Sequence, residues 1–124
     1  MSELTALSEV HELDAAIVES RDRPVLLFKH SRYCGLSCEA LDELHAHIAR
    51  TGARVSYRMI TVQTHRRVSD AAEERFGLRH ETPQAILLRG GKVVWNASHF
   101  HITAAELDRA ADRFAAAPRD VRRT

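Results

Sequence analysis

The chain has 124 residues, of which 44% are hydrophobic and 28% charged, and its formal net charge is +1 with the histidines neutral. This length fits one domain with a core of ordinary size. A charge so close to zero creates no field that would draw the protein to nucleic acid or to a membrane surface. The sequence contains no run of about 18 apolar residues, so we predict no transmembrane helix. We therefore expect neither nucleic acid nor a membrane among its partners.

The amino-terminal segment lacks a basic region followed by an apolar one, so we predict no secretory signal and a cytoplasmic location. Thiols stay reduced in the cytoplasm, and clustered cysteines there are more typical of a catalytic or metal site than of a structural disulfide. The two cysteines of the chain, Cys34 and Cys38, are four residues apart. Their spacing is the first indication of function.

Strand-like and helix-like patterns alternate along the chain. In order, we predict a strand at 4–7, a helix from a Ser8 cap to Ser20, a strand at 25–28, a helix from Cys34 or Gly35 to Arg50, a strand at 53–62, a helix from a Ser69 cap to Gly77, strands at 85–88 and 92–95 joined by a turn at Gly90–Gly91, and a helix from Thr103 to Pro118. The continuous apolar run at 25–28 indicates a strand buried on both faces.

This order, β-α-β-α-β-α-β-β-α, predicts an α/β domain with a mixed central sheet flanked by helices on both faces. It is the element order of a thioredoxin-like fold. We expect a single domain at residues 1–117 and a flexible tail at 118–124. A fold alone does not define a function, so the site has to carry that argument.

Cys34 follows the predicted buried strand and lies at the start of a helix. A helix N-terminus presents unpaired N–H groups and about half a positive charge, and both stabilise a thiolate relative to a thiol. The thiolate is the nucleophile of thiol–disulfide exchange. Because the flanking segment is polar and turn-like, we favour a reactive Cys34 over a buried thiol that only packs.

Cys38 lies one helical turn after Cys34, and two interpretations of it stay open. It continues a stripe through Leu41 and Ile48, which predicts an inward-facing side chain that fills core space. Alternatively, it is a resolving thiol, because Cα atoms four residues apart in a helix are about 6 Å apart, within the range of a disulfide.

Pro83 lies just before the predicted fourth strand. X–Pro bonds adopt the cis form at modest cost, and a cis proline marks a tight, fixed turn. In thioredoxin-like folds this turn packs against the reactive cysteine, and the backbone of the preceding residue, here Thr82, pairs with the substrate. Proline also marks an ordinary strand start. We assign Thr82 and Pro83 to substrate binding because of their position relative to Cys34.

Three more residues near Cys34 are candidates for the substrate site. His30 could tune the thiolate, or it could be a hydrogen-bonded structural residue at the end of a buried strand. Tyr33 is expected to flank the pocket. Ser37 could donate a hydrogen bond to the thiolate, or it could only cap the helix.

Several short blocks of the sequence resemble the YtxJ family of monothiol bacilliredoxins. These blocks are Phe28–Ser31 leading to Cys34–Ser37, His80–Gln84, Gly91–Trp95, Ser98–His99 and Ile102–Thr103, within a match from about Pro24 to Leu107. The resemblance implies a thioredoxin fold and one essential nucleophile, at Cys34. The family usually has proline at the position of Gly35 and a small residue at that of Cys38, which leaves a purely monothiol mechanism open to question.

The resemblance also implies a reaction. Bacillithiol, a low-molecular-weight thiol of certain bacteria, is the expected co-substrate, and bacillithiolated client proteins are the expected partners. The enzyme would need no bound cofactor and no metal. Because bacillithiol bears carboxylates, four cationic side chains could help to hold it, although the sequence does not separate them from ordinary surface charges: Lys29, Arg32, Arg66 and Arg67.

Other functions compete with this one. Cys34–Ser37 also resembles the signature of monothiol glutaredoxins, which carry iron–sulfur clusters, but the segment after the hairpin lacks their Gly-Gly-x-Asp pattern. The two cysteines and eight histidines could bind zinc or copper, although no four-ligand set emerges from their spacing. A non-catalytic adaptor with an unreactive Cys34 is the third alternative.

Overall fold

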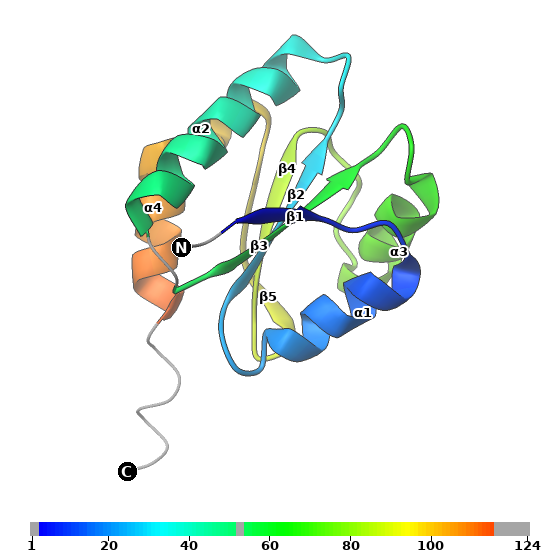
Figure 1. Cartoon of the computed structure of the whole chain (residues 1–124), viewed down its shortest axis with the longest axis horizontal. Helices are drawn as coiled ribbons and strands as arrows, with labels where there is room; N and C mark the ends of the chain where they lie inside the picture. Colours follow the sequence, from blue (N-terminus) through cyan, green and yellow to red (C-terminus); the bar gives the residue numbers. More distant parts are fainter. Residues whose placement is uncertain (1–2, 52–53, 116–124) are drawn as a thin grey trace.

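The computed structural model describes residues 3–51 and 54–115, which form one five-stranded sheet with helices on both faces (Figure 1). In chain order the elements are β1 (Leu4–Ala6), α1 (Val10–Glu19), β2 (Val25–His30), α2 (Gly35–Thr51), β3 (Ser56–Thr61), α3 (Arg66–Phe76), β4 (Gln84–Arg89), β5 (Lys92–Ser98), the 3-10 turn η1 (His99–His101) and α4 (Ala104–Ala115). This confirms the predicted order and adds η1. The predicted stop at Pro118 and the predicted tail lie outside the described residues.

The strands follow the order β1-β3-β2-β4-β5, so β2 lies in the middle of the sheet. It pairs with β3 in parallel and with β4 in antiparallel orientation. Every residue of β2 is buried, as its apolar run predicts, and the strand extends two residues beyond that run, to Lys29 and His30. Gly90 and Gly91 form the predicted hairpin turn with φ values of 68° and 79°, which glycine adopts without steric cost.

Each face of the sheet has its own hydrophobic cluster. Helices α2 and α4 cover one face, where Leu26 and Phe28 of β2 are buried, and α1 and α3 cover the other, where Val25 and Leu27 are buried (Figure 1). Side chains alternate between faces along a strand. His30 therefore points to the α2 side of the sheet and Lys29 to the α3 side.

Two predicted helix starts are wrong. Helix α1 is capped by Glu9 and not by Ser8, because the Glu9 carbonyl accepts the N–H groups of Glu12 (3.0 Å) and Leu13 (3.4 Å). The Glu12 carboxylate in turn accepts the N–H of Glu9 (3.0 Å). Helix α3 begins at Arg66, three residues before the predicted cap, and Ser69 is buried inside it. Serine is common at helix caps, but here the buried apolar positions begin at residue 68, so the helix has to start before Ser69.

The start of α4 agrees with the prediction. Thr103 caps it, because its hydroxyl accepts the N–H of Glu106 (3.2 Å). Glu43 of α2 accepts the N–H of Ala104 (2.7 Å), so a second free donor of α4 is satisfied by the neighbouring helix. The two helices on this face are therefore joined near the beginning of α4.

Candidate active site at the start of α2

Cys34 immediately precedes Gly35, the first residue of α2, and its carbonyl accepts the N–H of Cys38 (3.1 Å). It therefore occupies the cap position, next to N–H groups that have no partner within the helix. The first turn of this 17-residue helix carries no acidic side chain that would oppose a negative charge. Cys34 is half-buried and its thiol is free. The start of α2 therefore presents the Cys34 thiol at a half-buried position next to free backbone N–H donors.

Ser37 ties the first turn of α2 to the segment that leads to Cys34. Its buried hydroxyl accepts the N–H of Ser31 (2.9 Å) and forms a hydrogen bond of 2.8 Å with Nδ1 of His30. These contacts hold the strand end, the loop and the helix start at fixed distances from one another. The sequence predicts that Ser37 either binds the thiolate or caps the helix, and its observed hydrogen bonds are with His30 and Ser31.

His30 is 7% exposed, so it cannot offer a surface to a substrate. Burial lowers the pKa of its imidazole, and the positive charge of Arg32 lowers it further. Since an ordinary histidine titrates near 6.5, His30 is mainly neutral at pH 7. Of the two predicted roles of His30, tuning the Cys34 thiolate or a structural role, the structure shows a hydrogen bond to Ser37 in α2. Any effect of His30 on Cys34 would therefore act through the placement of the start of α2.

Gln63 holds the same loop from the opposite side, and sequence reasoning missed it. Its Nε2 donates to Oγ of Ser31 (2.6 Å), and its Oε1 accepts the N–H of Arg32 (3.1 Å). Gln63 lies between β3 and α3, about thirty residues away in the chain. A polar residue in a loop gives no local signal of such a contact, which exists because β2 and β3 end side by side.

Cys38 is exposed, so the prediction that it faces the core is wrong. The buried positions of α2 are Ser37, Ala40, Leu44 and His47, which follow helical spacing and leave Cys38 on the outer side. Its thiol is free and lies one turn along the helix from Cys34. Of the two interpretations of Cys38, the packing one is excluded.

The Thr82–Pro83 peptide bond is cis. Gln84, the first residue of β4, pairs with Lys29 of β2, and one further step of this antiparallel register brings Pro83 opposite His30. Because Gln84 and Lys29 point to the α3 side, Pro83 and His30 point to the α2 side. Figure 1 shows that α2 begins beyond this end of β2. The proline turn, His30 and the start of α2, which Cys34 precedes, therefore lie at the same end of the sheet.

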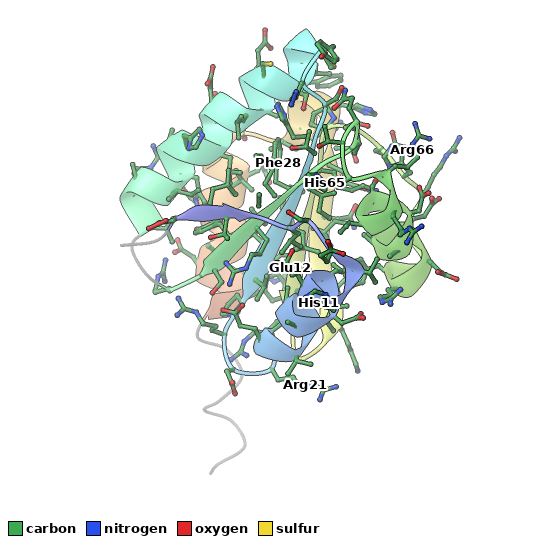
Figure 2. The ribbon with its side chains drawn as sticks, turned by 45° about the vertical axis from the view of Figure 1, so that its right-hand side comes forward. His11, Glu12, Arg21, Phe28, His65 and Arg66 are labelled. Carbon is green, nitrogen blue, oxygen red and sulfur yellow. The ribbon has the colours of Figure 1, made fainter. Side chains whose placement is uncertain are left out.

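The other predicted contact residues are spread around this centre. Tyr33 is 83% exposed, so its ring lies at the surface next to Cys34. Arg32, Arg66 and Arg67 are also exposed, and Figure 2 shows Arg66 beside His65 at the start of α3. Lys29, in contrast, is 0% exposed. The suggestion that Lys29 holds a ligand's carboxylate, and its alternative of an ordinary surface charge, are both wrong.

Two further findings concern other kinds of site. Within residues 3–51 and 54–115, no group of three or more histidine, cysteine, aspartate or glutamate side chains is arranged to hold a metal ion. No helix in the described part of the chain combines the length and the apolar character needed to cross a membrane.

The fold and the site define a class: a thioredoxin-fold protein with a cysteine at the N-terminus of its second helix, beside a cis-proline turn. A solved structure with a thioredoxin fold matches with a TM-score of 0.78 and 28% identity, over 86% of this chain and 92% of that one. A model of the monothiol bacilliredoxin BrxC family matches residues 5–107. The chain belongs to the monothiol bacilliredoxin family.

More distant structures share the fold. The thioredoxin of Fasciola hepatica matches with a TM-score of 0.71 and 16% identity, over 88% of this chain and 97% of that one. The thioredoxin of Malassezia sympodialis matches with a TM-score of 0.72 and 15% identity, over 94% of both chains. At this identity the likeness supports the architecture alone.

Proposed function

We propose that this protein is a cytoplasmic thiol–disulfide oxidoreductase that removes bacillithiol from mixed disulfides of client proteins, with Cys34 as the nucleophile. The observation that carries the proposal is the placement of Cys34 at the cap of α2, beside a cis-proline turn, in a chain of the bacilliredoxin family. The sequence blocks that resemble the YtxJ branch support membership of that branch.

The first step is an exchange at sulfur. The Cys34 thiolate attacks the bacillithiol sulfur of the client's mixed disulfide, and the client sulfur leaves as a thiolate. One disulfide bond breaks and another forms, so no external oxidant or reductant is needed. The product is Cys34 in a mixed disulfide with bacillithiol, together with a restored client thiol.

We propose Cys38 as the resolving thiol for the second step. It is exposed and one helical turn from Cys34, where its thiolate can attack Cys34 and release bacillithiol. The product is a Cys34–Cys38 disulfide, which two further bacillithiol molecules reduce as they become oxidised to their own disulfide. In a monothiol mechanism, a second bacillithiol would instead attack the adduct directly.

The remaining site residues act in binding and positioning. We propose that the Thr82 backbone pairs with the extended client segment around its disulfide, while Pro83 fixes the turn. Tyr33 contributes an exposed ring to the docking surface next to Cys34. His30 and Ser37 keep the start of α2 in register with the end of β2. Exposed Arg32 is the nearest cation in sequence to Cys34 and is suited to a carboxylate of bacillithiol.

The test is the intact mass of the reduced protein after exposure to oxidised bacillithiol. The wild type is compared with Cys34→Ser and with Cys38→Ser, two matched single-atom changes. We expect a stable bacillithiol adduct in Cys38→Ser and no adduct in Cys34→Ser, whose remaining thiol is Cys38. In the wild type we expect a transient adduct, followed by the loss of two hydrogens as the Cys34–Cys38 disulfide forms.

Each alternative has its own result. A stable adduct in the wild type would keep Cys34 as the nucleophile and remove Cys38 from the mechanism. Modification of Cys38 alone would show that Cys38, and not Cys34, is the nucleophile. An unmodified wild-type protein would overturn the proposed bacillithiol chemistry altogether.

A further inference from the structure

His99 has a left-handed backbone conformation. Among residues 3–51 and 54–115 it is the only non-glycine residue with a positive φ, at 56°. This left-handed conformation is uncommon outside glycine and is sterically unfavourable. It persists where several surrounding contacts determine it, and such positions cluster at functional sites. The contacts of His99 therefore indicate what the conformation achieves.

His99 contacts the proline turn through both its backbone and its side chain. Its N–H donates to the carbonyl of Pro83 (3.0 Å), one step beyond the last β4–β5 pair at Gln84 and Ser98. Its Nε2 lies 3.2 Å from Oε1 of Glu81. Thr82 lies between the two contacted residues. The turn is thus held at both ends by a single residue.

The same residue faces the start of α2. His99 lines a cavity of about 150 Å³ between η1 and α2, together with Leu36 and Glu39. Leu36 follows Cys34 by two residues in the first turn of the helix. His99 is therefore in a position to set the separation between the helix that carries Cys34 and the turn that carries Thr82.

We propose that His99 is a positioning residue that latches the Glu81–Pro83 turn and presents the Thr82 backbone to the client. The inference rests on the proposed function, in which this backbone pairs with the client segment. His80 also contacts this turn, since its Nε2 is 3.3 Å from Oγ1 of Thr82. The left-handed backbone of His99 directs its N–H and its imidazole toward the turn at the same time.

The test uses three variants of the full chain. His99→Asn keeps the N–H and tolerates a positive φ, but its shorter side chain loses the reach to Glu81. Glu81→Ala removes the same contact from the other partner, and the double variant closes the cycle. His101→Asn is the matched control, because His101 is an exposed histidine of the same 3-10 turn.

We measure turnover of a bacillithiolated client protein, alkylation of Cys34 by iodoacetamide, and hydrogen exchange of the amide at residue 99, whose N–H donates to the carbonyl of Pro83. In His99→Asn and Glu81→Ala we expect a KM about three- to tenfold higher, as for the loss of one partly exposed polar contact. We expect kcat and the alkylation rate to stay within twofold and the amide at residue 99 to exchange faster. The double variant should be no worse than either single variant.

Each readout can overturn the inference. If KM or the exchange rate is unchanged in His99→Asn, His99 does not hold the Glu81–Pro83 turn. If the alkylation rate falls while KM stays constant, His99 acts on Cys34 and not on client binding. Effects that add in the double variant show that His99 and Glu81 act separately. If the wild type fails to turn over the client, the proposed function falls, while hydrogen exchange still decides whether His99 holds the turn.

Discussion

Lys29 is a charged residue type in a fully buried position of the central strand. Its Nζ has no hydrogen-bond partner, and neither has Oε1 of Gln84, the residue paired with it across β2 and β4. Burial lowers the pKa of Lys29, against the attraction of Glu73 and Asp70 on α3. Buried amines without partners cost stability. Lys29 is thus a place where the sheet is less stable than an apolar residue would make it.

We predict that Lys29→Met stabilises the protein by about 1–3 kcal/mol at pH 7, because it removes a buried polar group and keeps the chain length. The unfolded chain binds a proton at Lys29 more tightly than the folded protein does. The stability of the wild type therefore rises with pH until the lysine of the unfolded chain also loses its proton, near 10.5. Urea unfolding at pH 7 and pH 10 should show the gain shrinking at the higher pH.

Lys92→Met serves as the control, because Lys92 is exposed on the edge strand. Its stability should change by less than about 0.5 kcal/mol. A destabilised Lys29→Met at pH 7 would mean that the amine makes a compensating interaction in the folded protein, and the prediction would then be wrong.

At the scale of elements, a polar cluster joins α2 to α4 and β3. Burial raises the pKa of Tyr57 to about 12, so its phenol stays protonated and donates to Nε2 of His47 (2.7 Å). Nδ1 of His47 then carries the proton that it shares with Oδ1 of Asp108 (2.6 Å), and Arg50 donates to Oδ2 (2.7 Å). His47 is 2% exposed. Three elements therefore depend on one buried imidazole.

We predict that Asp108→Asn lowers the free energy of unfolding by about 1–2 kcal/mol at pH 7, because His47 and Arg50 lose a charged acceptor. Burial disfavours the carboxylate of Asp108, but the hydrogen bonds from His47 and Arg50 outweigh that effect and lower its pKa below 3.8. The wild type keeps this stabilisation above pH 3.8 and loses it as the pH falls through the lowered pKa. Unfolding measured from pH 7 to pH 2 should show the two proteins converging.

The comparison variant is Asp112→Asn, four residues further along α4. Asp112 is 72% exposed and pairs with Arg54, an arrangement that contributes little to stability. A loss in Asp112→Asn as large as that in Asp108→Asn would attribute the effect to general charge on α4 and contradict the prediction.

The elements also show where sequence reasoning succeeds. Apolar periodicity predicted the order of helices and strands, because each element buries a face whose spacing is visible in the chain. It failed for Cys38, because two polar residues, Ser37 and His47, occupy the buried stripe of α2. Their burial depends on partners in β2, β3 and α4. Gln63 and His99 likewise contact residues that are distant in the chain, so no local sequence pattern reveals these contacts.

The same distinction applies to the site. The position of Cys34 and the proline turn could be predicted, since a helix start after a buried strand and an X–Pro pair before another strand are local features. The burial of Lys29 could not, because a lysine at the end of an apolar run normally signals the surface. It lies inside because α3, which carries Glu73 and Asp70 near the Lys29 amine, covers this face of the sheet.

At the scale of the whole molecule, both hydrophobic clusters are built on the same two central strands. Leu27 and Leu88 belong to one cluster, and Phe28 and Leu87 belong to the other. Neither face can separate without exposing strands that the other face also needs. The two clusters are therefore expected to unfold together, as in most single domains of this size.

We predict that Leu13→Ala, on α1, lowers the free energy of unfolding by about 2–5 kcal/mol, as expected when a fully buried leucine is truncated. Unfolding in urea, followed by circular dichroism and by pulsed hydrogen exchange of the α2 amides, should remain a single transition with coincident midpoints. Val18→Ala is the control on the same helix, because Val18 is 58% exposed. Separate midpoints for the two probes would show that the faces unfold independently.

Trp95 is the single tryptophan of the chain, and it packs against the cluster under α4. It lines a surface hollow with Ala110 and Phe114 of that helix. Intrinsic fluorescence excited at the tryptophan band therefore has one source, at the edge strand and away from the face that carries α1 and α3. The emission spectrum should report in real time whether α4 is packed against the sheet. No dye or label needs to be attached, so both cysteines stay free for chemistry during the recording.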